Sequence, residues 1–132
     1  MPRDLDRNSV LVDTSAWIDF FNSDSESSRL VARLVEENRA VIIGPVIYEV
    51  LQGARSREES DVVLSALLGL DSVETTTHLW IKAGELSSGL RKKGVTLPMS
   101  DVLIASAAIE NDFSVLTSDS HFAKIPHLKL YK

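Results

Sequence analysis

The chain has 132 residues, of which 44% are hydrophobic and 25% charged; it contains no cysteine, and its formal net charge is −5. These values fit one globular domain, residues 1–132, with a polar N-terminal tail over residues 1–8. They exclude disulfides and thiolate metal sites, and no apolar run approaches the roughly 20 residues that a membrane-spanning helix needs. Because the N-terminus lacks an apolar secretory core, we expect a cytoplasmic protein without a membrane partner.

The net charge also bears on the class of partner. A charge of −5 argues against nucleic acid, whose phosphates are negative. Two bound divalent cations, however, would leave a net charge of about −1. A nucleic-acid partner therefore stays open if several acids belong to a metal site.

The N-terminal half of the sequence alternates strand patterns with helical patterns. Residues 9–13 (SVLVD) and 40–44 (AVIIG) are short apolar runs with polar boundaries, which is typical of strands buried inside a parallel sheet. The apolar spacing between and after these runs predicts helices over residues 14–22, 25–38 and 45–55.

The C-terminal half continues the alternation. Residues 113–119 (FSVLTSD) predict a third buried strand, and 128–132 (LKLYK) a last edge strand. Residues 100–112 are apolar almost all round, so we expect a central buried helix there. Two further helices and a short strand are expected over about 57–69, 78–94 and 72–76, respectively.

Several residues have the chemistry of helix ends. Ser27 or Ser28 is expected to cap the helix over 25–38, and Ser100 the buried helix after Pro98. Gly94 follows the last helical residue of its segment, where glycine readily takes the left-handed conformation that ends a helix.

The order of elements predicts the fold class and the position of a site. Strands alternating with helices give an α/β fold, a parallel sheet with helices on both faces. Ligands bind such sheets beyond the carboxyl ends of the strands. Asp13 and Asp119 end two strands there, whereas Glu49 and Asp101 lie in the first turn or so of helices that begin at the same edge. All four carboxylates are therefore expected to converge.

Each of these acids, taken alone, also has a purely structural explanation. Asp13 fits the N-cap of the helix that follows it, and Asp119 fits the cap of a short terminal helix. Glu49 fits the polar face of its helix, and Asp101 complements a helix dipole.

The four acids together predict a metal site. Carboxylates packed together repel each other unless cations neutralise them. Oxygen ligands without Cys or an ordered His pair suit Mg²⁺ or Mn²⁺ rather than zinc, and such ions activate water and stabilise a phosphodiester under attack. His121 and His127 are expected near the terminal loop as surface or packing residues.

Three stretches, taken in order, resemble a known family: VLVDTSAWIDFF, PVIYEVLQGAR and PMSDVLIASAAIENDFSVLTSDSHFAKIPHLKL. They are similar to PIN-domain ribonucleases, and most similar to the VapC-type toxins of bacterial toxin–antitoxin pairs, from about residue 9 to 130. Each motif alone is common, but the ordered set is specific. The resemblance implies a three-layer α/β/α sandwich around a central parallel sheet. It also implies an endoribonuclease that depends on Mg²⁺ or Mn²⁺ and acts as the toxin of a VapBC-type pair.

The resemblance also implies roles for the four acids. Asp13 and Asp101 resemble the main metal ligands of the family. Glu49 and Asp119 resemble its remaining acids, which bind metal directly or through water.

Hydroxyl residues match the family near two of these acids. Ser15, or Thr14 beside it, corresponds to the hydroxyl that orients metal-associated water or phosphate. Ser118 stands where a basic residue is more common in the family, so one possible phosphate contact is missing here.

The implied partners are an RNA substrate, a VapB-like antitoxin in a heteromeric complex, and a second copy of the chain in a homodimer. The helix that carries Trp17, Phe20 and Phe21 supplies either core or interface residues. An antitoxin tail is expected to block the site, with an arginine placed among the carboxylates. The candidate RNA contacts are Arg55 and Arg57, and the helix end formed by Arg91, Lys92 and Lys93, which also complements a helix dipole.

Two other classes of α/β protein with acids at strand ends need residues that this sequence lacks. A two-component receiver domain needs adjacent acids on its first strand, where only Asp13 is present. A haloacid-dehalogenase-type phosphatase needs a second aspartate two residues later, a place that Ser15 occupies. A non-catalytic PIN-like RNA-binding or assembly module and a DNA-cleaving PIN relative remain as alternatives.

Overall fold

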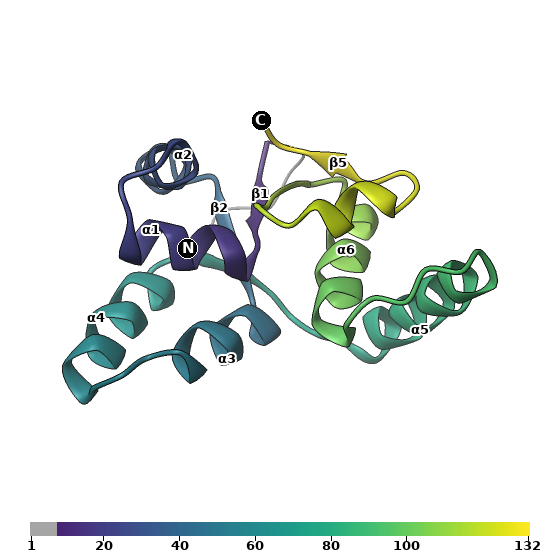
Figure 1. The fold of residues 1–132 in the computed structure, drawn as a ribbon, viewed down its shortest axis with the longest axis horizontal. Coiled ribbons are helices and arrows are strands. Elements are labelled where there is room, and N and C mark those ends of the chain that lie inside the picture. Colours follow the sequence, from purple (N-terminus) through teal and green to yellow (C-terminus); the bar gives the residue numbers. More distant parts are fainter. Residues whose placement is uncertain (1–7) are drawn as a thin grey trace.

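A computed structural model, which describes residues 8–132, contains a five-stranded parallel sheet (Figure 1). The strand order is β3-β2-β1-β4-β5. The strands are β1 (Val10–Val12), β2 (Ala40–Ile43), β3 (Asp71–Val73), β4 (Ser114–Leu116) and β5 (Lys129–Leu130). Apart from Asn8, the expected N-terminal tail lies outside the described residues.

Six α-helices cover the sheet. In Figure 1, α1, α2 and α4 lie on one side of β1, whereas α5 and α6 lie on the other. This α/β/α layering confirms the predicted fold class. The helices are α1 (Thr14–Asn22), α2 (Glu26–Glu36), α3 (Gly44–Gln52), α4 (Arg57–Leu68), α5 (Thr77–Lys92) and α6 (Met99–Asn111), and a short 3₁₀ helix, η1 (Ser120–Lys124), follows β4.

The core lies around the central strands and α6. Every residue of β1 and β2 is buried, as expected for strands with helices on both faces. In α6 every residue from Val102 to Ala108 is buried, which confirms the prediction of a central helix. This packing fixes the first turn of α6, and with it Asp101, against the edge of the sheet.

Two of the predicted helix caps are wrong. Ser25, rather than Ser27 or Ser28, caps α2, because its extended backbone lets its hydroxyl accept the N–H of Ser28 while the Ser28 hydroxyl accepts the N–H of Ser25. Pro98 occupies the N-cap position of α6, so Ser100 lies inside the first turn and its hydroxyl is free to contact another helix. Gly94 does follow α5 with a φ of +82°.

The strand order places the acids at a topological switch point. The first strand, β1, pairs with β2 on one side and with β4 on the other, so the chain order reverses between β1 and β4. Crevices at the carboxyl ends of such strands are where open α/β sheets bind ligands. Asp13 follows β1 directly, and Asp119 lies three residues beyond the end of β4.

Within residues 8–132, no helix combines the length and the apolar character needed to cross a membrane.

Candidate functional site

The four predicted acids lie together at this edge of the sheet. Asp13 is buried directly after β1, whereas the other three acids are half-buried. Asp101 is the third residue of α6. Glu49 lies in the second turn of α3 rather than the first, because α3 begins at Gly44, immediately after β2.

Burial and mutual repulsion act most strongly on Asp101. Removal of its carboxyl from water, and to a lesser extent the charges of Asp13, Asp119 and Glu49 in that order of size, together raise its pKa from 3.8 to about 6. The nearby His121 opposes this shift. Among residues 8–132, no lysine or arginine forms an ion pair with any of the four acids. The site therefore concentrates negative charge that no described lysine or arginine neutralises.

Two hydroxyls hold one oxygen of Asp13. Ser15 Oγ donates to Asp13 Oδ2 at 2.8 Å, and Thr117 Oγ1 donates to the same oxygen at 2.7 Å. Each hydroxyl in turn accepts a hydrogen bond from a backbone N–H of the segment after β4. The N–H of Ser118 donates to Ser15 Oγ at 3.0 Å, and the N–H of Asp119 donates to Thr117 Oγ1 at 2.9 Å. These two chains of hydrogen bonds join the ends of β1 and β4, and no described residue donates to Asp13 Oδ1.

Both oxygens of Glu49 are occupied by hydroxyls. Thr14 Oγ1 donates to Oε1 at 2.6 Å, and Ser100 Oγ donates to Oε2 at 3.1 Å. Thr14 and Ser15 thus have different partners, because consecutive residues at the start of α1 face Glu49 and Asp13 respectively. Glu49 itself is half-buried rather than on an exposed polar face.

Asp119 both caps a helix and faces the other acids. Its Oδ1 accepts the backbone N–H of His121 at 2.9 Å and lies 3.0 Å from the Nδ1 atom of the same histidine. One ligand atom each from Asp101, Asp119 and His121 lie within 4.8 Å of one another. His121 is on the surface, as expected, but its ring belongs to the acid cluster, which the sequence interpretation did not foresee.

Thr117 is the site residue that sequence reasoning missed most clearly. It follows β4 directly, in the same place relative to its strand as Asp13 relative to β1. That position was a usable signal. The Ser118 hydroxyl, by contrast, donates to Asp19 at 2.9 Å. Asp19 belongs to α1, so a carboxylate besides the four acids lies close to the segment after β4.

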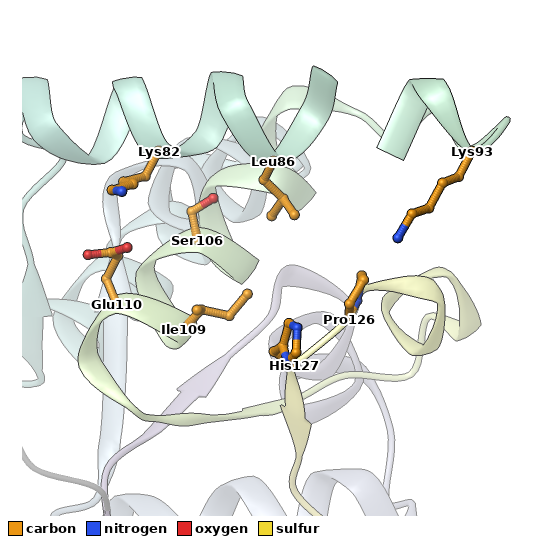
Figure 2. A pocket seen from close by; sticks show the side chains of 8 residues that line it. All are labelled: Lys82, Leu86, Lys93, Ser106, Ile109, Glu110, Pro126 and His127. Carbon is orange, nitrogen blue, oxygen red and sulfur yellow. The ribbon is translucent and has the colours of Figure 1, made fainter. Parts of the chain in front are cut away.

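The predicted RNA contacts lie apart from the acids. All five are exposed, and no hydrogen bond or ion pair among the described residues joins any of them to the acid cluster. Arg57 pairs instead with Asp61 at 3.6 Å, and Arg55 lines a hollow beside α1 and α4. Arg91 and Lys92 lie on the last turn of α5, whereas Lys93 lines a cavity between α5 and α6 (Figure 2).

The aromatic residues of α1 divide between core and surface. Trp17 is buried, with its ring centroid 5.6 Å from that of Phe20 and 6.1 Å from that of Phe21. Phe20 and Phe21 are half-buried. Trp17 is therefore a core residue, and the outer part of this face remains accessible.

The chemistry of the site fits a hard divalent cation. Asp13 Oδ1 and Asp119 Oδ2 accept no hydrogen bond from residues 8–132, and neither oxygen of Asp101 does. Carboxylate oxygens that converge without a lysine or arginine among the described residues are the ligands that Mg²⁺ and Mn²⁺ prefer. The half-buried setting would strengthen their interaction with such an ion.

Comparison with known proteins gives a consistent result. The family model of the PIN domain matches residues 10–128. A VapC ribonuclease of Mycobacterium bovis, Mb1587, is 27% identical over 124 residues, which cover 90% of this chain and 92% of the relative. The crystal structure of VapBC2 from Rickettsia felis bound to a promoter DNA fragment superposes with a TM-score of 0.79 at 24% identity, covering 92% of this chain and 96% of that one. A toxin–antitoxin complex from Klebsiella pneumoniae superposes with a TM-score of 0.70 at 23% identity, with coverages of 91% and 95%.

Proposed function

The chain belongs to the PIN domain family, and from that premise we propose that it is a metal-dependent endoribonuclease, the toxin of a VapBC-type pair. The similarity to a VapC ribonuclease over 90% of the chain supports the substrate class. The observation that carries the proposal is the group of four carboxylates with no lysine or arginine partner among the described residues, at the switch point of the sheet. In this proposal the enzyme acts in the cytoplasm.

In this proposal, Asp13, Asp101 and Asp119 hold Mg²⁺ or Mn²⁺ directly, because each has an oxygen that accepts no hydrogen bond from the described part of the chain. Glu49 acts through water, because both of its oxygens accept hydroxyl protons. When bound, such a cation lowers the pKa of a coordinated water and offsets the charge that develops on phosphate.

The remaining residues position these ligands. Ser15 and Thr117 fix the orientation of the Asp13 carboxylate by donating to the same oxygen. Thr14 and Ser100 hold Glu49 from two different helices. No side-chain nucleophile is required, because water attacks phosphorus and the ribose oxygen leaves. The basic residues Arg55, Arg57, Arg91, Lys92 and Lys93 are proposed to contact RNA phosphates away from the cleaved bond.

Cleavage of total cellular RNA by the purified protein tests this function. We expect fragments with Mg²⁺ or Mn²⁺, none with chelator, and none with Asp101→Ala. The matched control is Asp24→Ala, which removes an exposed carboxylate that pairs with Arg29. Single-stranded DNA of similar length serves as a second substrate. Cleavage of DNA but not RNA would contradict the proposed substrate, and metal-independent cleavage would contradict the mechanism.

We also propose that an antitoxin inhibits the enzyme by placing an arginine among the carboxylates. A guanidinium would pair with free carboxylate oxygens bidentately, and the site offers such oxygens on three aspartates. Nearby apolar surface would hold the rest of the antitoxin segment, because Ile18 and Val62 are 43% and 64% exposed. RNA cleavage that continues at its full rate in saturating cognate antitoxin would refute this inhibition.

A homodimer is proposed on the face beside Glu49. Tyr48, Trp80 and Met99 are 68%, 45% and 67% exposed there and line a hollow of about 430 Å³. A second copy would remove this apolar surface from water. Light scattering should show a dimer that Trp80→Asp converts to a monomer with unchanged circular dichroism. A wild-type monomer at high concentration would exclude this interface.

A further inference from the structure

A cavity of about 360 Å³ lies between α5, α6 and the turn that follows η1 (Figure 2). Its volume is at the lower end of the range of about 300–1,000 Å³ that small-molecule sites occupy. None of the residues that line the cavity belongs to the acid cluster. Within residues 8–132, none of them forms a hydrogen bond or an ion pair with an acid of that cluster. The role proposed for the acids therefore leaves this cavity unexplained.

The middle of the cavity is apolar. Leu86 of α5 and Ile109 of α6 face it from two helices, and Pro126 closes it from the chain beyond η1 (Figure 2). Leu86 and Ile109 are only half-buried, so the cavity leaves their side chains partly exposed to water. A ligand with a flat apolar body would cover both.

A buried hydroxyl without a partner lies in the wall of this cavity. Ser106 is 3% exposed, and its Oγ forms no hydrogen bond with residues 8–132, not even with the helix carbonyl four residues earlier. In Figure 2 the hydroxyl points from α6 toward the α5 side, next to Leu86. Buried polar groups normally have partners, and an unsatisfied one in a cavity wall indicates a site where a ligand atom supplies the missing hydrogen bond.

One end of the cavity is cationic. The side chains of Lys93 and His127 take part in no hydrogen bond or ion pair with residues 8–132. In Figure 2, Lys93 extends from the end of α5 toward Pro126, and His127 lies on the other side of that proline. The backbone of His127 has a φ of +68°, an uncommon conformation for a residue other than glycine, and it holds the imidazole at the rim of the cavity. An anionic group between these two side chains would receive charge-assisted hydrogen bonds.

The other end offers both donors and acceptors. Glu110 Oε2 lies 3.2 Å from His78 Nε2, which leaves Oε1 without a partner among the described residues. Lys82 is only 3.8 Å from Glu85, a weak contact at an exposed position. A fatty acid would bring an apolar tail against these groups and desolvate them. A nucleobase has polar atoms on its edge and apolar faces, so it matches this end and the middle together.

We propose that this cavity binds a mononucleotide. The phosphate lies between Lys93 and His127, and the base lies between Leu86 and Ile109 with its edge toward Glu110. The Ser106 hydroxyl donates to the ligand after a small rotation of Leu86. The mononucleotide is either free or the terminal nucleotide of an RNA strand. The site is separate from the acid cluster and does not depend on nuclease activity.

A titration followed by ¹⁵N NMR tests this site directly, with chelator present so that no cation bridges a phosphate to the acids. The probe is AMP, compared with adenosine, inorganic phosphate and octanoate. AMP should shift amide signals around Leu86, Ile109 and His127, with adenosine and phosphate each binding at least about tenfold more weakly. A 5′-phosphorylated triadenylate distinguishes the two sources. If it shifts the same amides as AMP, the RNA terminus is accepted, and if it does not, only the free nucleotide fits.

Two variants locate the phosphate, and a third tests the hydroxyl. Lys93→Gln should weaken AMP binding by about tenfold, whereas Lys124→Gln, the same change on an exposed residue of η1 that does not line the cavity, should weaken it by less than about twofold. Ser106→Ala should weaken binding by about threefold without lowering the melting temperature, because the hydroxyl lost has no partner among residues 8–132. The proposal is overturned by equal losses in the two lysine variants, by octanoate binding more tightly than AMP, or by no amide shifts at about 5 mM AMP.

Discussion

The acid cluster has two halves, Asp13 with Glu49 and Asp101 with Asp119, which differ in the groups that balance their charge. Asp13 and Glu49 together accept four hydrogen bonds from hydroxyls of their own chain. Asp101 accepts none from residues 8–132, and burial with three neighbouring acids raises its pKa to about 6. The chain thus stabilises the negative charge of Asp13 and Glu49, and it leaves Asp101 in need of an external cation.

This difference explains why so many hydroxyl residues surround the site. Hydroxyls that donate to a carboxylate favour its charged form without adding a positive charge that would compete with a metal. The same hydroxyls accept backbone N–H groups from residues 118 and 119, so they also fix the segment that carries Asp119. The positions of Asp13 and Asp119 are therefore coupled, whereas α6 positions Asp101 independently.

The largest expected effect is the loss of cleavage rate when one acid of either half is replaced. Asp101→Asn removes a carboxylate that has no hydrogen-bond donor within the described chain, and it should lower the rate about a thousandfold. Glu49→Gln keeps a group that its two hydroxyl partners can still contact, and it should lower the rate about 10–100-fold. Single-turnover kinetics on one RNA substrate would measure both. Equal losses would show that the two halves do not differ in function.

A smaller effect is expected from the hydroxyls themselves. Thr117→Val removes the donor to Asp13 and the acceptor for the Asp119 N–H, so cleavage should fall about 10–100-fold with the fold intact. Ser118→Ala is the matched control, because its exposed hydroxyl contacts Asp19 instead, and it should change the rate by less than about threefold. The coupling of the two strand ends would be contradicted if Ser118→Ala cost as much as Thr117→Val.

The smallest effect is on stability without metal, and its sign depends on pH. The folded-state pKa of Asp101 is about 6, above the ordinary 3.8, so the folded chain binds more protons than the unfolded chain between these values. Metal-free stability should therefore fall as the pH rises from about 4 to about 6. Asp101→Asn should be more stable than wild type at pH 8, on the order of 1 kcal/mol after allowance for solvent screening, and equal to it below about pH 4.

Thermal melts in chelator at the two pH values would detect this as a shift of about 3–5 °C at pH 8 alone. A variant that is less stable than wild type at pH 8 would mean that the Asp101 charge is already balanced within the chain.

The fold was predictable from the sequence because its signals are strong and local. Buried strands such as β1 and β2 are continuous apolar runs, and α6 is apolar all round because it has no solvent face. The predicted caps failed at Ser27, Ser28 and Ser100 because several serines lie near each helix start, and only the backbone conformation decides which of them is the N-cap.

The candidate site was only partly predictable. The position of the acids at strand and helix ends follows from topology, so their convergence could be inferred. Which hydroxyl donates to which acid depends on side-chain geometry, and Thr117 and His121 joined the cluster through contacts that the sequence does not specify. The cavity beside Ser106 was not predictable at all, because it depends on imperfect packing between α5 and α6.

Calorimetric titration of the antitoxin-free protein with Mn²⁺ tests the central claim most directly. The account predicts that wild-type protein binds Mn²⁺, that Asp101→Asn weakens binding by at least about thirtyfold, and that Thr14→Val weakens it by less than about threefold. Asp24→Asn, the exposed control, should bind like wild type. If folded wild-type protein binds no Mn²⁺, or if Asp101→Asn binds it as tightly as wild type, these carboxylates do not form the cation site proposed for them.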